Sequence, residues 1–278
     1  MGSLSNLTNK IDWSKLTLAD DFFFGYAMKN ARLCKEFLEI LLNTKIAEIQ
    51  HLQIQGYEKE NINEHGVLLD VKLVADGKVI NVEMQTTNEK DLELRSRYYQ
   101  ALTDAHLLDK GKPYTDLPEF LTIFICTFDY FKEGLPLYTV QNTIKELNHK
   151  EFGDKRKILV YNTRAYKNAF TEEQKGLLNF ITGGEPTSQR VRGFAKDIDD
   201  LKKESKFKEE YMNYYLKTNE MIYKAKAEGI KIGIQQGMAE QKLKDETLIL
   251  QQKEDLLKQA EQIKLLKEQL ATLKSNTK

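Results

Sequence analysis

Alternating apolar and polar residues between positions 66 and 85 most limit what this 278-residue chain can fold into. Period two is the side-chain period of a β-strand. The alternation is interrupted by Ala75-Asp76-Gly77-Lys78, a segment typical of a tight turn between two strands. The sequence therefore predicts a two-stranded antiparallel hairpin with Asp76 and Gly77 at its turn.

Pairing Ala75 with Lys78 fixes the register of the whole hairpin and gives it two different faces. One face carries only apolar pairs, which are Leu69 with Met84, Val71 with Val82 and Leu73 with Ile80. We expect that face to pack against the core. The other face places Asp70 opposite Glu83 and Lys72 opposite Asn81, with Gln85 two residues beyond Glu83.

Two carboxylates that face each other on a sheet repel, so something must balance their charge. One candidate is Lys72 as an internal counter-ion. The other is a divalent cation such as Mg²⁺ or Mn²⁺, which prefers carboxylate oxygens as ligands. The charge pattern alone favours solvated structural charges, because most polar sheet faces are simply wet.

The rest of the chain alternates between helical and strand patterns. Residues 19–50 are predicted to form one or two helices packed into the core, and 92–108 another helix. FLTIFICTF at 120–128 is typical of a buried central strand, KILVYN at 157–162 predicts a further strand, and 172–217 is mainly helical in pattern.

The sequence changes character near Met221, and residues 221–278 predict an extended helix. This segment has no Pro, no Trp and a single aromatic residue, and it is rich in Lys, Glu, Gln and Leu. A heptad series is formed by Ile249, Leu256, Ile263 and Leu270. A coiled coil that joins copies of the chain is the favoured interpretation, and a lone amphipathic helix is the alternative.

The hairpin with its flanks resembles a known family. GVLLDVKLV-ADGK-VINVEMQTT followed by LELRSRYYQ is similar to the signature of the PD-(D/E)XK nuclease superfamily. More narrowly, it resembles the recombination-promoting nuclease (Rpn) or transposase family, in which glutamine replaces the usual lysine of the last motif. DDFFFGYAM, LCKEFLEILL, KGKPY, FICTFDYF and GLPLYT extend the similarity over roughly residues 15–165.

The resemblance implies an α/β fold, with a restriction-endonuclease-like mixed sheet flanked by helices and a long C-terminal helix or coiled coil. The expected parts are a nuclease-like core at 15–165, a helical extension at 166–220 and the coiled-coil tail at 221–278. The resemblance also makes Asp70 and Glu83 ligands of Mg²⁺ or Mn²⁺ and places Gln85 where the superfamily has its lysine. The implied activity is metal-dependent hydrolysis of DNA phosphodiester bonds.

Gln85 leaves a second interpretation open. A lysine ammonium stabilises charge that builds up on a phosphate, whereas a neutral amide only orients water through hydrogen bonds. The alternative is therefore a catalytically weak or inactive nuclease-derived protein that binds DNA or acts as a scaffold through its coiled coil.

Several other residues are candidates for the same site. Arg97 and Tyr98 are tentative substrate-binding residues, whereas Arg95 is equally explained by a surface ion pair with Glu93 or Asp91. An additional acidic ligand is expected from the first helical region, and the candidates are Asp21, Glu36 and Glu39. Gln100 and Asp104 are possible supporting groups around Arg97.

Composition and charge exclude several other classes. The 42 basic and 42 acidic residues balance, so the bulk charge does not indicate a general polyanion binder. Cys34 and Cys126 lie in apolar surroundings, which predicts buried free thiols. The four histidines lack zinc-binding spacing. No signal peptide or membrane-spanning stretch is apparent, so a cytoplasmic location is expected.

Overall fold

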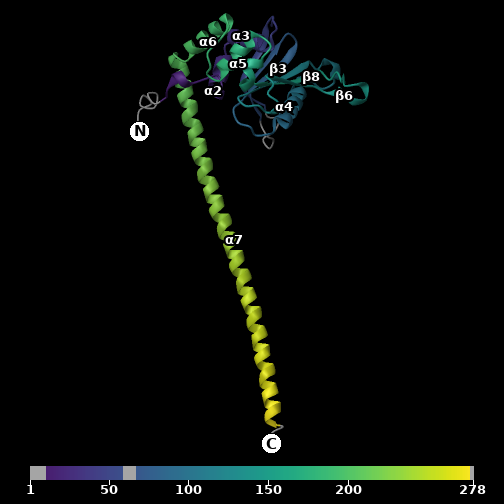
Figure 1. Ribbon diagram of the computed structural model, residues 1–278, viewed down its shortest axis with the longest axis vertical. Coiled ribbons are helices and arrows are strands. Elements are labelled where there is room, and N and C mark those ends of the chain that lie inside the picture. The colour runs from purple at the N-terminus through teal and green to yellow at the C-terminus, as the bar shows by residue number, and fades with distance from the viewer. Residues whose placement is uncertain (1–10, 59–66, 276–278) are drawn as a thin grey trace. The chain divides into compact units, whose positions relative to one another are not determined.

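A computed structural model describes residues 11–58 and 67–275, with side chains described for 11–50, 71–259 and 261 (Figure 1). The chain divides into two compact units, Met1–Tyr214 and Tyr215–Lys278. The first unit contains a six-stranded mixed sheet flanked by helices. The α/β fold class predicted from the sequence is confirmed, as is the long C-terminal helix.

The elements of the chain have the following bounds. The helices are α2 (Asp21–Met28), α3 (Ala31–Leu42), α4 (Leu92–Leu107), α5 (Glu172–Ile181), α6 (Gln189–Leu201) and α7 (Ser205–Ser275). The strands are β1 (Ile49–Glu58), β2 (Val67–Ala75), β3 (Lys78–Gln85), β4 (Glu119–Cys126), β5 (Leu137–Val140), β6 (Thr143–Ile144), β7 (Lys150–Glu151) and β8 (Arg156–Asn162). Short 3₁₀ turns are η1 (Trp13–Lys15), η2 (Tyr114–Asp116), η3 (Lys145–Leu147) and η4 (Thr163–Asn168).

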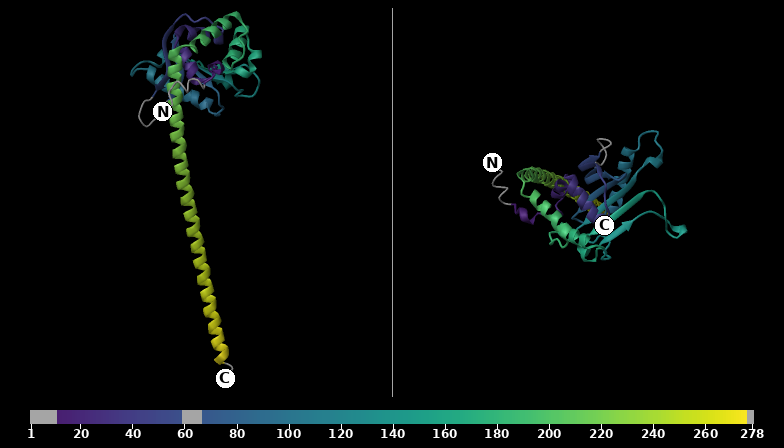
Figure 2. Two further views of the ribbon diagram at one scale, coloured as in Figure 1. Left: turned by 90° about the vertical axis from the view of Figure 1, so that its left-hand side faces the viewer. Right: turned by 90° about the horizontal axis from the view of Figure 1, so that it is seen from above.

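The main sheet has the strand order β1-β2-β3-β4-β8-β5. β1, β2 and β3 are antiparallel neighbours, β3, β4 and β8 run parallel, and β5 returns antiparallel to β8. The small β6–β7 hairpin projects away from this sheet (Figures 1 and 2). β3 and β4 occupy the two central positions, which agrees with the prediction of a buried strand near 120–128.

The predicted hairpin forms with the predicted register. Val71 pairs with Val82, Leu73 with Ile80 and Lys72 with Asn81, and the turn lies at Asp76 and Gly77. Both turn residues have positive φ, 50° and 72°, as a two-residue turn of type I′ requires. The side chain of Leu69, predicted to face Met84, lies outside the described side chains.

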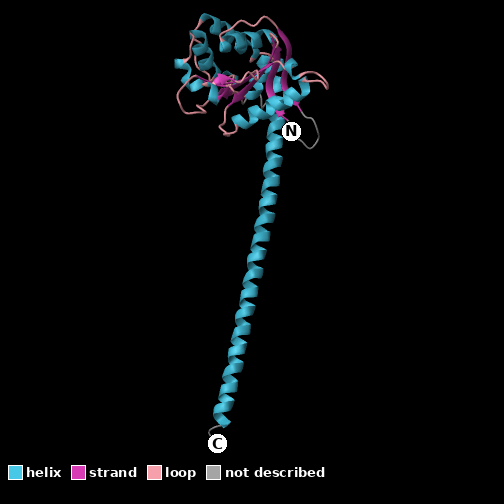
Figure 3. Ribbon diagram, turned by 90° about the vertical axis from the view of Figure 1, so that its right-hand side faces the viewer, coloured by secondary structure: helices cyan, strands magenta, loops and turns pink. Residues whose placement is uncertain are grey.

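The two faces of the sheet are covered differently. Helices α2, α3, α5 and α6 pack on one face, where they share a core with the alternate β3 residues Ile80, Val82 and Met84. Helix α4 lies on the other face, where Leu92 packs with Phe124 (Figure 1). Figure 3 shows the strands running between these helical layers. The opposite side chains of β3 therefore face α4.

The region predicted as helix at 19–50 is two helices followed by a strand. The Asn30 side chain accepts hydrogen bonds from the backbone N–H groups of Arg32 and Leu33 and so caps α3 separately from α2. Asn43 adopts a left-handed conformation and ends α3. The prediction that helix continues to residue 50 is wrong, because β1 begins at Ile49.

Helix α7 begins in the first unit, where Phe207 and Met212 are buried and Trp13 packs edge-on against Phe207 and Tyr211. Every described side chain from residue 219 to 259 is exposed, including Ile249 and Leu256. The heptad positions Ile263 and Leu270 have no described side chains. None of the described helices combines the length with the apolar composition that a membrane span requires.

Candidate active site

Three polar side chains on β3 form the centre of the candidate site. Asn81, Glu83 and Gln85 alternate with the core residues of β3, so all three face α4. Their exposed fractions are 0%, 2% and 9%. A carboxylate that is almost fully removed from water needs a compensating charge or several hydrogen bonds.

Arg95 from the first turns of α4 supplies that charge. Its Nη2 lies 3.4 Å from Glu83 Oε2, and its Nη1 donates a hydrogen bond of 2.8 Å to Gln85 Oε1. Its Nε donates to the Tyr99 hydroxyl at 2.9 Å, and a looser ion pair of 3.9 Å joins it to Asp91. The guanidinium therefore connects Glu83 to Gln85 and is held in place from α4 itself.

Arg95 stays charged in these surroundings. Burial alone would lower its pKa, but the hydrogen bond from Arg95 to Tyr99 and the nearby charges of Glu83 and Asp91 raise it above its ordinary value. The cation also lies over the Tyr99 ring, 5.5 Å from the ring centre. The aromatic ring and the carboxylates thus hold a permanent positive charge beside Glu83.

Asn81 has an unused acceptor in this cluster. Its Nδ2 donates to Glu83 Oε1 at 3.3 Å, while its buried Oδ1 has no hydrogen-bond partner among the described residues. An unsatisfied buried oxygen costs free energy on the order of 1–3 kcal/mol. Such an oxygen next to a buried carboxylate is suited to a ligand that accepts lone pairs, such as a hard cation.

Asp70, the other predicted ligand, lies in β2 by its backbone. It directly precedes Val71, whose partner Val82 directly precedes Glu83, so the antiparallel register continues to Asp70 opposite Glu83. The side chain of Asp70 lies outside the described side chains, so its pairing with Glu83 stays a prediction. Among the described side chains no group of three or more His, Cys, Asp or Glu residues is arranged to hold a metal ion.

The acidic candidates from the first helices lie elsewhere. Asp21 is the exposed first residue of α2, and α2 and α3 pack on the face of the sheet opposite Glu83. Glu36 and Glu39 both approach Arg190 of α6, at 3.9 Å and 2.6 Å. Participation of Asp21 or Glu36 in a metal site therefore stays a prediction without a contact that supports it.

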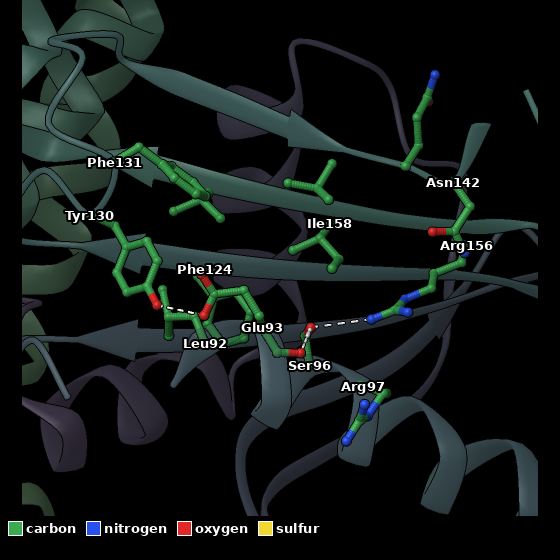
Figure 4. A pocket seen from close by; sticks show the side chains of 13 residues that line it. Leu92, Glu93, Ser96, Arg97, Phe124, Tyr130, Phe131, Asn142, Arg156 and Ile158 are labelled. Atoms are coloured by element: carbon green, nitrogen blue, oxygen red, sulfur yellow. Dashed lines mark hydrogen bonds between the residues drawn. The ribbon is translucent and has the colours of Figure 1, made fainter. Parts of the chain in front are cut away.

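The two tentative substrate-binding residues on α4 are both exposed. Arg97 lines a cavity together with Leu92 and Ser96 of α4 (Figure 4), and Tyr98 has an exposed fraction of 40%. Gln100 and Asp104 are partly buried, and the pKa of Asp104 is raised by burial. The arginine that reaches the candidate site is Arg95. The sequence alone explains Arg95 equally well by an ion pair at the surface.

The buried cysteines match their prediction. Cys34 and Cys126 are free and buried, and burial raises the pKa of each thiol to about 12. Neither thiol is therefore a reactive thiolate at neutral pH.

Comparison with protein families tests the resemblance to PD-(D/E)XK nucleases that the hairpin and its flanks suggest. The family described as PD-(D/E)XK nuclease family transposase matches residues 21–228. The chain belongs to this family. No curated protein and no solved structure gives a significant match. The PD-(D/E)XK match begins at the first residue of α2 and includes the whole sheet, α4 and the Glu83–Arg95 cluster.

Proposed function

We propose that this PD-(D/E)XK protein is a Mg²⁺- or Mn²⁺-dependent DNA endonuclease of the recombination-promoting, transposase-like type. The observation that carries the proposal is the buried Glu83 on β3, beside the unsatisfied Asn81 Oδ1. Family membership supports a nuclease-like function independently of that geometry.

The oxygen-rich side chains fit a hard divalent cation. Asp70 and Glu83 would hold the ion, with the Asn81 amide oxygen close to Glu83. A bound Mg²⁺ would lower the pKa of a water molecule and neutralise charge that builds up on the scissile phosphate. The strands fix the side chains before any ligand arrives, which reduces the cost of ordering them during the reaction.

Arg95 provides the positive charge that Gln85 lacks. In this proposal the Gln85 amide oxygen holds the Arg95 guanidinium through its 2.8 Å hydrogen bond. A guanidinium stabilises negative phosphate oxygens through charge and directed hydrogen bonds. The lysine of the superfamily motif is thereby replaced by a pair of residues, one on β3 and one on α4.

The test is incubation of the purified protein with supercoiled plasmid DNA, with and without Mg²⁺ or Mn²⁺. We expect metal-dependent nicking that Asp70→Ala and Glu83→Ala each reduce by roughly a hundredfold or more. Nicking that persists in EDTA, or that both variants retain in full, would contradict the proposal.

One observation favours the second function, a nuclease-derived DNA-binding or scaffold protein that does not cut. Arg95 lies 3.4 Å from the Glu83 carboxylate, and a fixed cation there opposes the approach of a metal ion. The two functions differ in Mn²⁺ affinity, which electron paramagnetic resonance measures directly. Saturable binding that is lost in Glu83→Ala supports the nuclease, and its absence supports the scaffold.

A further inference from the structure

A second cavity lies on the α4 face of the sheet and is separate from the Glu83–Arg95 cluster. It has a volume of about 210 Å³ and is bordered by α4, β4, β8, the end of β5 and the segment that follows β4 (Figure 4). Its floor and walls are mostly apolar and aromatic side chains, including Leu92, Phe124, Tyr130, Phe131, Ile158 and Val160.

The rim leaves apolar surface in contact with water. Phe131 and Val140 have exposed fractions of 37% and 42%, although they adjoin a buried floor. Removing such surface from water is favourable by about 25 cal/mol per Å². A cavity of roughly 150 Å³ accepts a benzene ring, so this cavity is large enough for one flat ring system.

Two arginines give one side of the cavity a positive charge. Arg156 donates a hydrogen bond from Nη2 to Ser96 Oγ at 3.2 Å, and its charge offsets part of the rise that burial causes in the pKa of Asp104. Within the described part of the chain, neither Arg97 nor Arg156 is paired with a carboxylate. Both guanidiniums are therefore available to an anion.

Glu93 is the one carboxylate among the described residues that line the cavity, and it is already engaged. Glu93 Oε2 accepts a 2.6 Å hydrogen bond from the Tyr130 hydroxyl, which is visible in Figure 4. Burial, together with this hydrogen bond, raises the pKa of Tyr130 to about 12. Tyr130 therefore remains a neutral phenol that holds Glu93, and the pair forms a fixed wall.

Two amides supply hydrogen-bonding groups at the rim. Gln141 Nε2 donates to Glu151 at 3.1 Å, and Asn142 Nδ2 donates to Asp154 at 2.6 Å. These contacts use amide nitrogens and leave the amide oxygens as acceptors. Amide side chains of this kind bind the edges of nucleic-acid bases, including the amino group of adenine.

From these groups we infer that the cavity binds one nucleotide, with the base against the aromatic walls and the phosphate at Arg97 and Arg156. The choice of a nucleotide over other aromatic anions rests on the proposed nuclease function. Enzymes that modify a base take it out of its stack into such a pocket, and proteins that hold single strands stack bases on aromatic side chains. The same chemistry would also accept a free mononucleotide.

Calorimetric titration of the full chain with deoxyadenosine monophosphate in EDTA tests the inference without any cleavage. We expect saturable binding that is at least about tenfold tighter than binding of deoxyadenosine or inorganic phosphate alone, because the ring and the charge contribute together. Thymidine monophosphate, which lacks an exocyclic amino group, should bind more weakly. The absence of saturable binding would overturn the inference.

Matched variants locate the binding. Arg97→Met and Arg156→Met should each weaken binding by about tenfold, whereas the control Arg192→Met, an exposed arginine on α6, should not. Val140→Trp should block the cavity from its exposed rim, while Val140→Thr keeps the residue size and the strand preference. Unchanged affinity in both arginine variants and in Val140→Trp would place the nucleotide elsewhere and overturn the inference.

A single-stranded oligonucleotide with one 2-aminopurine distinguishes the two sources of the nucleotide. If the cavity takes a base from a strand, unstacking should raise the fluorescence in the unaltered protein and not in Val140→Trp. If deoxyadenosine monophosphate binds and the oligonucleotide gives no such signal, the cavity serves free nucleotides. Plasmid nicking is measured separately, so a failed nuclease assay and a failed binding assay remain distinct results.

Discussion

Arg95 brings a positive charge directly to the Glu83 carboxylate of the candidate site. It touches Glu83, Gln85, Asp91 and Tyr99 at once, and its side chain has an exposed fraction of only 25%. Its role could not be predicted from the sequence, because helical periodicity does not say which side of α4 faces β3. The carboxylate at Glu83 was predictable, since strand alternation alone places it opposite the core.

Moving the charge tests the role of Arg95. If Arg95 replaces the lysine of the motif, Arg95→Met should lower plasmid nicking by roughly a hundredfold. Adding Gln85→Lys to that variant should restore much of the loss, because the cation returns to β3. Initial nicking rates at saturating Mn²⁺ measure the loss in Arg95→Met and the recovery in the double variant, with Arg192→Met as the control. A double variant as inactive as Arg95→Met would assign Arg95 a structural role.

Glu39 was a candidate metal ligand, but its contacts are structural, in contrast to those of Glu83. It accepts hydrogen bonds from Arg190, Lys45 and the Ile46 backbone N–H. Burial raises the pKa of Glu39, but the Ile46, Arg190 and Lys45 contacts outweigh that effect and hold the pKa below its ordinary value of 4.5. The stabilisation is therefore present above about pH 5 and is lost as the pH falls through the lowered pKa.

Glu39→Gln should therefore destabilise the fold in a pH-dependent way. At pH 7 we expect a loss of about 1–3 kcal/mol, the cost of leaving buried partners unpaired. The difference between the two proteins should shrink as the pH falls through the lowered pKa of Glu39, because Glu39 itself then becomes neutral. Urea unfolding at several pH values measures this, and a pH-independent difference would contradict the assignment.

At the scale of elements, the hairpin was predictable and its neighbour was not. β2 and β3 alternate cleanly around Asp76 and Gly77, whereas β1 is an edge strand that pairs only with β2 and shows no continuous apolar run. The turn is also tied to the rest of the unit, because the Asp76 carboxylate accepts a hydrogen bond from the Ala47 backbone N–H. The hairpin is thus anchored at its tip.

Two glycines in different elements should respond oppositely to alanine. Gly77 has φ +72°, and an added Cβ at Gly77 or Gly193 would meet nothing within 4 Å. Gly77→Ala should therefore lower stability by about 1 kcal/mol through backbone strain alone. Gly193→Ala, inside α6, should raise it by up to about 1 kcal/mol. Thermal unfolding followed by circular dichroism measures both, and shifts of equal sign would contradict this.

At the scale of the whole molecule, the described part of the second unit is one helix, and its described side chains from residue 219 onward are all exposed. Ile249 and Leu256 belong to the heptad series and have exposed fractions of 51% and 64%. A regularly spaced exposed apolar series on a polar helix is typical of a surface that pairs with another helix. We propose that copies of the chain associate through this seam.

Removing the tail should therefore change the number of subunits. A shortened chain that ends at Met221 retains the α7 residues Phe207 and Met212, which are buried in the first unit, so it should stay folded. Light scattering should give an oligomer for the full chain and a monomer for the shortened one. Ile249→Lys with Leu256→Lys should act like the truncation, and an unchanged subunit count in both would exclude the tail as the assembly element.

The salt bridge between Glu83 and Arg95 also bears on the stage at which a nuclease of this kind would become active. Because Arg95 already neutralises the buried carboxylate, we expect the first unit to fold as it is synthesised, without a bound metal ion. For the metal-dependent nuclease proposed above, folding and activation would then be separate events, and the supply of metal would set the second. A nuclease of this design would be fully folded when its synthesis ends and would stay inactive until it binds metal.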